Sequence, residues 1–162
     1  MAATPTTAYT PVMAQLTGNT NGALQNLPAV TVAGARERVF VGQIALAAQA
    51  SGTVIGIARL PIGAIITDIR AVTDTSLGTA TIEIGDAGNA NSAKYAAAQT
   101  LTAVGAPVLL GNPATMGVPI TAGFDGPSGL PSQSYEDVTL TVGTAALPGA
   151  GNLTVIVKYA ID

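Results

Sequence analysis

Short runs in which apolar and polar residues alternate, closed by glycine- and proline-rich turns, constrain the fold of this chain most. Thr79–Gly85, Asp137–Gly143 and Leu153–Ile161 all alternate in this way. A period of two residues is what a β-strand with one buried face requires. The residues that this pattern predicts to face the core are Ala80, Ile82, Ile84, Val138, Leu140, Val142, Leu153, Val155, Val157, Tyr159 and Ile161.

Further segments between these runs have the character of strands. Arg38–Ala47, Thr53–Leu60 and Ala64–Thr73 are rich in Val, Ile and Thr, and Val108–Leu110 is a shorter candidate. The alanine-rich stretch Lys94–Thr102 fits a short helix or a strand. Roughly seven or eight strands joined by short turns predict an all-β fold, an antiparallel β-sandwich or barrel, because such turns are too short for helical crossovers.

Residues 1–35 differ in composition from the rest of the chain. This difference predicts two parts, an N-terminal arm, 1–35, and a β-sandwich domain, 36–162. The arm is rich in Thr, Asn, Gly and Pro and lacks a sustained period. Either it is a coil packed on its own domain, or it is extended and docks on a neighbouring subunit or a partner. The apolar residues expected to make such contacts are Tyr9, Val12, Leu16, Leu24 and Leu27.

Gly111–Ser134 is dense in glycine and proline and is expected to be the least regular part of the sandwich domain. Long irregular stretches in a compact domain tend to be functional loops or disordered segments.

The strand Thr53–Leu60 is apolar on both faces if its residues alternate strictly. A sandwich strand often keeps one face polar. Either a loop covers the second face of this strand, or another subunit does. The second interpretation makes Ile55 and Ile57 candidate partner-binding residues.

Arg36, Glu37 and Arg38 form the densest charge cluster of the chain, at the predicted junction between arm and domain. One interpretation is a solvated hinge. The other is an anchor that binds an acidic surface on a partner through Arg36 and Arg38.

Other charged residues are expected to pair or to lie in solvent. Asp68 and Arg70 share one strand face, and Arg59 and Glu83 lie on other strands, so cross-strand or intersubunit ion pairs are possible partnerships. Such exposed pairs are worth only about 0–1 kcal/mol.

Two groups of acidic residues are candidate sites. Glu136 and Asp137 are adjacent, so in a strand they point to opposite faces, and we expect a solvated strand start rather than an acid–base pair. Asp86, Asn89 and Asn91 crowd one loop, but their spacing does not match a calcium-binding loop, and these residue types are common in turns.

The composition argues against most chemistry. The chain has no His and no Cys, only 9% of its residues are charged, and its net charge is -3. These absences remove the usual general bases, thiol nucleophiles and transition-metal ligands. We therefore predict no enzyme, no catalytic residues, no cofactor and no metal. Nucleic-acid binding is not expected, because the few cations are scattered. No membrane contact is expected either, because no apolar run approaches about 20 residues.

Three stretches carry a resemblance to a known group of proteins: Arg59-Leu60-Pro61-x-Gly63-Ala64, Thr73-Asp74-x-x-Leu77-Gly78-x-Ala80-Thr81 and Ile84-Gly85-Asp86. In these turns and strands the chain resembles small structural proteins of tailed-phage virions, especially capsid decoration (cement) proteins with jelly-roll-like β-sandwiches. The resemblance extends roughly from Val39 to Ile161.

The resemblance implies a protein of the virion, made in the host cytoplasm and added to the outside of an assembled capsid. Its partner would be the major capsid protein, whose neighbouring subunits it would clamp, and it would act as a homo-oligomer, commonly a trimer. Two alternatives stay open. One is a tail- or fibre-associated virion protein. The other is a carbohydrate-binding β-sandwich, for which four Tyr, two Phe and no Trp are a poor supply of sugar-stacking side chains.

Overall fold

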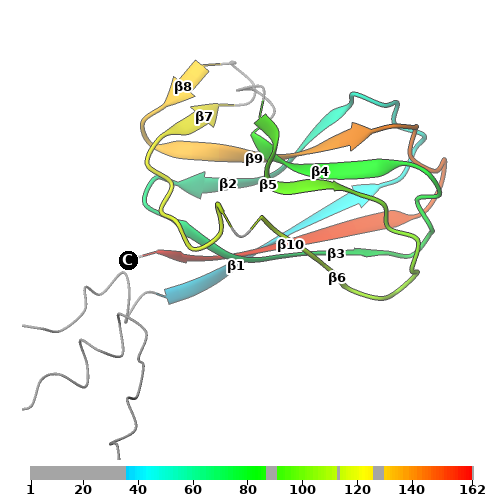
Figure 1. Cartoon of the computed structure of the whole chain (residues 1–162), viewed down its shortest axis with the longest axis horizontal. Helices are drawn as coiled ribbons and strands as arrows, with labels where there is room; N and C mark the ends of the chain where they lie inside the picture. The colour runs from blue at the N-terminus through cyan, green and yellow to red at the C-terminus, as the bar shows by residue number, and fades with distance from the viewer. Residues whose placement is uncertain (1–35, 87–90, 113, 126–129, 162) are drawn as a thin grey trace, which may run out of the picture. The chain divides into compact units, whose positions relative to one another are not determined.

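The computed structural model describes residues 36–86, 91–112, 114–125 and 130–161, and within them it is an antiparallel β-sandwich. Two four-stranded sheets face each other, and a two-stranded hairpin lies at one end (Figure 1). The predicted all-β class is confirmed. None of the described residues belongs to a helix that could span a membrane.

One layer, which we call sheet A, has the strand order β1-β10-β3-β6. Its strands are β1 (Arg36–Ala45), β10 (Asn152–Ile161), β3 (Ile65–Thr73) and β6 (Val108–Leu110). The long central strands β10 and β3 are paired antiparallel, and β6 pairs antiparallel with β3. Strand β1 lies at the other edge and has β10 as its neighbour.

The second layer, sheet B, has the strand order β2-β9-β4-β5. Its strands are β2 (Val54–Pro61), β9 (Tyr135–Gly143), β4 (Thr81–Asp86) and β5 (Asn91–Gln99), paired antiparallel throughout. The alanine-rich segment that fitted helix or strand is therefore mostly the strand β5.

The core lies between the two sheets and is built from the residues predicted by alternation. Leu140, at the centre of β9, is fully buried between Ile55 of β2 and Ile84 of β4, its register partners. The other buried side chains on the inner faces include Ala80, Ile82, Val138, Val142, Leu153, Val155, Val157 and Tyr159. Burial of these small and β-branched residues supplies the main driving force for folding, about 25 cal/mol for each Å² of apolar surface.

A β-bulge explains why β2 reads as apolar on both faces. Its pairing with β9 shifts between Gly56 and Ala58, so that Ile57 is an extra residue without a register partner. The alternation changes phase there, and Ile55, Ile57, Ala58 and Leu60 all pack in or against the core. The second face of β2 is thus covered within the chain, because Ile57 belongs to the core and Ile55 packs against it. A partner-binding role for Ile55 and Ile57 stays a prediction.

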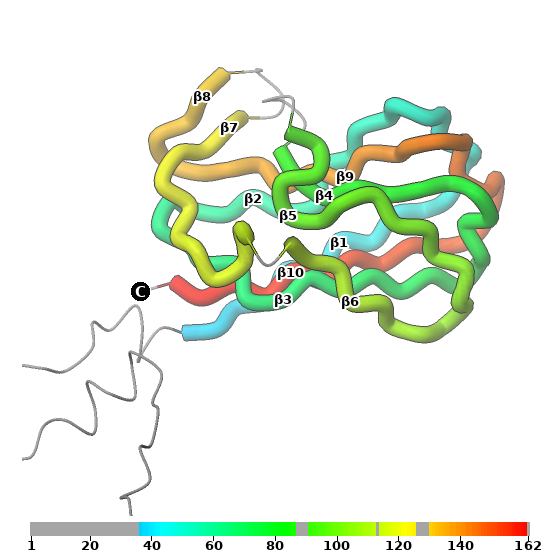
Figure 2. The backbone as a smooth tube through the Cα atoms, in the orientation of Figure 1, coloured from blue at the N-terminus to red at the C-terminus, as the bar shows by residue number. Residues whose placement is uncertain are grey.

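The segment Gly111–Ser134 is more ordered than its composition suggested. It contains β7 (Gly123–Asp125) and β8 (Leu130–Ser132), which form the end hairpin beside β9. The stretch before the hairpin crosses one end of the sandwich (Figure 2). There Ile120 donates its N–H to the Ala64 carbonyl and accepts the Gly63 N–H, at 2.9 and 2.8 Å. Backbone bonds thus fix it to the corner between β2 and β3.

The predicted arm, residues 1–35, lies outside the described residues, together with its candidate contacts Tyr9, Val12, Leu16, Leu24 and Leu27. The arm and the jelly-roll connectivity stay predictions.

Candidate functional site

A cluster of charged side chains is buried at the end of the sandwich that carries the hairpin. Glu136 continues the inward alternation of β9 and is 0% exposed, and Asp86 continues the inward alternation of β4. The solvated strand start expected for Glu136 and Asp137 is therefore wrong, because both are buried. They do point to opposite faces, as alternation requires.

Lys94 of β5 is the cation of this cluster. Its Nζ lies 2.8 Å from both carboxylate oxygens of Glu136 and 3.1 Å from Oδ2 of Asp86. The Tyr95 hydroxyl donates to Oε1 of Glu136. The pKa of Tyr95 is raised, mainly because the hydroxyl is buried and secondly because of this hydrogen bond. The hydroxyl thus stays protonated at neutral pH and acts as a donor. Buried charges need ion pairs and hydrogen bonds to offset the loss of hydration. Here those contacts link three strands of sheet B: β4, β5 and β9.

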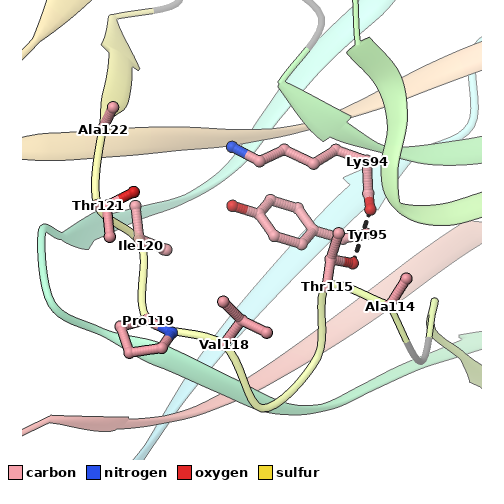
Figure 3. Close-up of a pocket in the computed structure, with 9 residues that line it drawn as sticks. All are labelled: Lys94, Tyr95, Ala114, Thr115, Val118, Pro119, Ile120, Thr121 and Ala122. Carbon is pink, nitrogen blue, oxygen red and sulfur yellow. Dashed lines mark hydrogen bonds between the residues drawn. The ribbon is translucent and has the colours of Figure 1, made fainter.

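A depression of about 200 Å³ opens beside this cluster (Figure 3). Lys94 and Tyr95 are its ionisable lining residues, and the stretch from Ala114 to Ala122 supplies the rest. Thr115 donates its hydroxyl to the Lys94 carbonyl at 2.7 Å, which ties that stretch to β5. Both ionisable groups are already held by Glu136. The ionisable groups that line the depression are therefore engaged in hydrogen bonds within the chain.

Arg59 makes a second polar cluster, on the outer face of sheet B. Its guanidinium binds both carboxylate oxygens of Asp137, its register partner on β9, at 2.6 and 2.7 Å. It also contacts Asp125 of the hairpin at 3.1 Å and lies 3.9 Å from the centre of the Tyr135 ring. The hydrogen bond to Asp137 raises the pKa of Arg59. The cross-strand ion pair of Arg59 is formed with Asp137, and the additional contact with Asp125 links the hairpin to sheet B.

Arg59→Lys is expected to loosen the end hairpin while leaving the sandwich folded, because lysine keeps the charge but cannot form the two-pronged bond or stack on Tyr135. Hydrogen exchange of the β7 and β8 amides should become faster. Arg70→Lys is the matched control, since the one ion pair that Arg70 forms with a described residue runs along its own strand, to Asp68. Equal exchange in the two variants would show that the Arg59 cluster does not hold the hairpin.

The outer face of sheet A mixes charged and apolar side chains. Asp68 and Arg70 of β3 form an ion pair at 2.7 Å along one strand, so this expected pair lies within the chain. Lys158 stands opposite Asp68 on β10, and Leu109 of β6 stands opposite Arg70 and is 65% exposed. Glu83, on sheet B, accepts a hydrogen bond from Ser92.

The first half of β1 is the most exposed strand segment of the described chain. All six residues from Arg36 to Val41 are exposed, including the large apolar side chains of Val39, Phe40 and Val41. We call this segment the β1 edge. Arg36 and Arg38, which the sequence singled out, both lie in it.

Sequence reasoning missed the Lys94–Glu136 pair and the Asp125 contact. The inward position of Glu136 could have been found, because it has the same parity as Val138 and Leu140. Lys94 and Asp125 carry no comparable signal, since their partners are 42 and 66 positions away in the chain.

No protein-family model matches the chain, and neither does the sequence of any curated protein. Solved structures do share its fold. A chain in the cyanophage Pam1 capsid asymmetric unit is 22% identical, with a TM-score of 0.57 over 79% of this chain and 86% of that one. A chain in the capsid of Ralstonia phage GP4 is 19% identical, with a TM-score of 0.53 over 79% and 84%. At these identities the likeness establishes a common β-sandwich fold.

Proposed function

We propose that the chain is a non-enzymatic structural protein of a phage virion. In this proposal it binds the outside of the capsid and stabilises contacts between major capsid subunits. The observation that carries the proposal is the fold shared with chains in two phage capsid structures over 79% of this chain. The passage of successive strands between sheets A and B supports the jelly-roll-like topology that the sequence resemblance implies.

The way the described charges are used also supports a structural role. Lys94 and Arg59, the two cations of sheet B, are each held by two carboxylates. Both cations stabilise the pairing of strands within the chain. In the proposal, contacts with the capsid are made by other surface residues. We favour assembly as a homo-oligomer, and a trimer in particular. Several weak contacts made by one oligomer would together give a high overall affinity for the shell.

The test is to mix the purified protein with capsids assembled without it and to image the particles. We expect regular density over the shell, at positions between neighbouring capsid subunits. Density only at the tail or its vertex would replace the proposal with a tail- or fibre-associated role. Binding to immobilised glycans with no binding to capsids would favour a carbohydrate-binding module instead.

The arm is proposed to contribute contacts to a neighbouring subunit or to the capsid, with Arg36 and Arg38 beside it. Deletion of residues 2–33 is expected to weaken capsid binding or to change the oligomeric state, as measured by co-sedimentation and by analytical ultracentrifugation. If both measurements match the full-length protein, the arm has no contact role.

A further inference from the structure

Among the described residues, no layer covers either face of the β1 edge. Successive strand residues point to opposite sides, and every residue from Arg36 to Val41 is exposed. Val39 and Val41 share one side, and Phe40 lies on the other, with exposed fractions of 55%, 59% and 39%. β1 is also the edge strand of sheet A, with β10 on its one paired side (Figure 1). An exposed apolar edge is a template for pairing with a further strand.

The cations of the β1 edge are unpaired within the described structure. Arg59, Arg70 and Lys94 each form an ion pair with a described carboxylate. Arg36 and Arg38 form none with any described residue. The β1 edge thus combines exposed apolar side chains, backbone groups at a sheet edge and two arginines that form no ion pair with a described residue.

A second copy of this chain is a poor match for that chemistry. Of its nine acidic residues only Asp162 lies outside the described part, and each of the others already accepts a hydrogen bond from a described donor. The chain's own residues 1–35 contain no Asp or Glu at all. Charge complementarity therefore favours a different protein.

We propose that the β1 edge binds an extended, acidic segment of another protein, which adds to sheet A as a further strand. Backbone hydrogen bonds would give the pairing, the valines and Phe40 would contact apolar side chains, and carboxylates of the segment would meet Arg36 and Arg38. This inference rests on the proposed function, because the capsid shell is the surface expected to carry the segment.

The test compares two charge-reversed variants for co-sedimentation with capsids assembled without the protein. Arg36→Glu/Arg38→Glu alters the β1 edge. Arg70→Glu/Lys158→Glu is the matched control: it makes the same change in net charge on the outer face of the same sheet. We expect the first variant to lose about tenfold or more in affinity and the second to lose little, since juxtaposed like charges weaken an interface strongly. Circular dichroism verifies that both variants fold.

A second measurement locates the added strand. Hydrogen exchange of the 36–41 amides in the wild-type protein should slow when capsids are bound. Wild-type binding with equal affinity of the two variants would overturn the β1-edge inference and leave the proposed function intact. A change in self-association of Arg36→Glu/Arg38→Glu without loss of capsid affinity would assign the edge to a second copy and overturn it too. Absence of wild-type binding would overturn both proposals.

Discussion

Lys94→Met is expected to lower the free energy of unfolding by about 3–5 kcal/mol, the cost of leaving a buried carboxylate without its cation. Glu136 is 0% exposed, and Lys94 is the cation that contacts both of its oxygens. Methionine keeps the length and apolar stem of lysine, so the variant isolates the loss of charge. Urea unfolding followed by circular dichroism measures the change.

The matched control is Lys158→Met, which removes a lysine that forms no ion pair with a described residue. Its effect should stay within about 0.5 kcal/mol. The double variant Lys94→Met/Glu136→Leu should be less destabilised than Lys94→Met, because it removes one of the two buried carboxylates, Glu136 and Asp86, that the single variant leaves without a cation. A Lys94→Met protein as stable as the Lys158→Met protein would show that the buried cluster does not hold this end of the sandwich.

Gly85→Ala is expected to cost about 3 kcal/mol, because an added methyl group would collide with backbone atoms rather than with a movable side chain. A Cβ on Gly85 would overlap the Asn91 carbonyl and the Ser92 backbone. Strand β5 would have to move away from β4, which would disturb the pairing that places Lys94. The unfolding midpoint in urea should fall, and exchange of the β5 amides should rise.

Gly56→Ala is the control within the same sheet. Gly56 is exposed, and a Cβ there would meet nothing within 4 Å. We expect a change within about 0.5 kcal/mol, in either direction. If the two alanine variants unfold at the same urea concentration, the close approach of β4 and β5 at Gly85 does not make a side chain there destabilising.

Much of the fold was predictable, because its strands follow a two-residue period. Alternation placed Ile82, Leu140 and Val155 in the core correctly, and turns rich in glycine and proline marked the strand ends. The alternation of β2 was misleading because a bulge changes phase in mid-strand, and no local residue type announces such an insertion. The nature of Lys94–Thr102 stayed open since alanine suits both helices and strands.

The buried charge cluster was only partly predictable. The parity that placed Val138 inward also places Glu136 inward, but the chemical character of glutamate suggested solvent. Burial of such a group depends on a partner, and Lys94 comes from a strand whose register is set by tertiary pairing. The polar contacts of Arg59 with Asp125 likewise depend on where the hairpin lies.

Because of the bulge in β2, the face to which each side chain points depends on the number of residues in the strand as well as on their types. With strict alternation from Ile55, the side chain of Arg59 would point into the apolar interior and Leu60 would point to solvent. Ile57, as the one supernumerary residue, reverses both orientations. Arg59 reaches Asp137 and the hairpin only because of a residue two places earlier that pairs with nothing. In a homologue that lost this one residue, each position from 58 to 61 would point to the opposite face. Apolar and polar residues would then have to swap places there for the core to stay apolar.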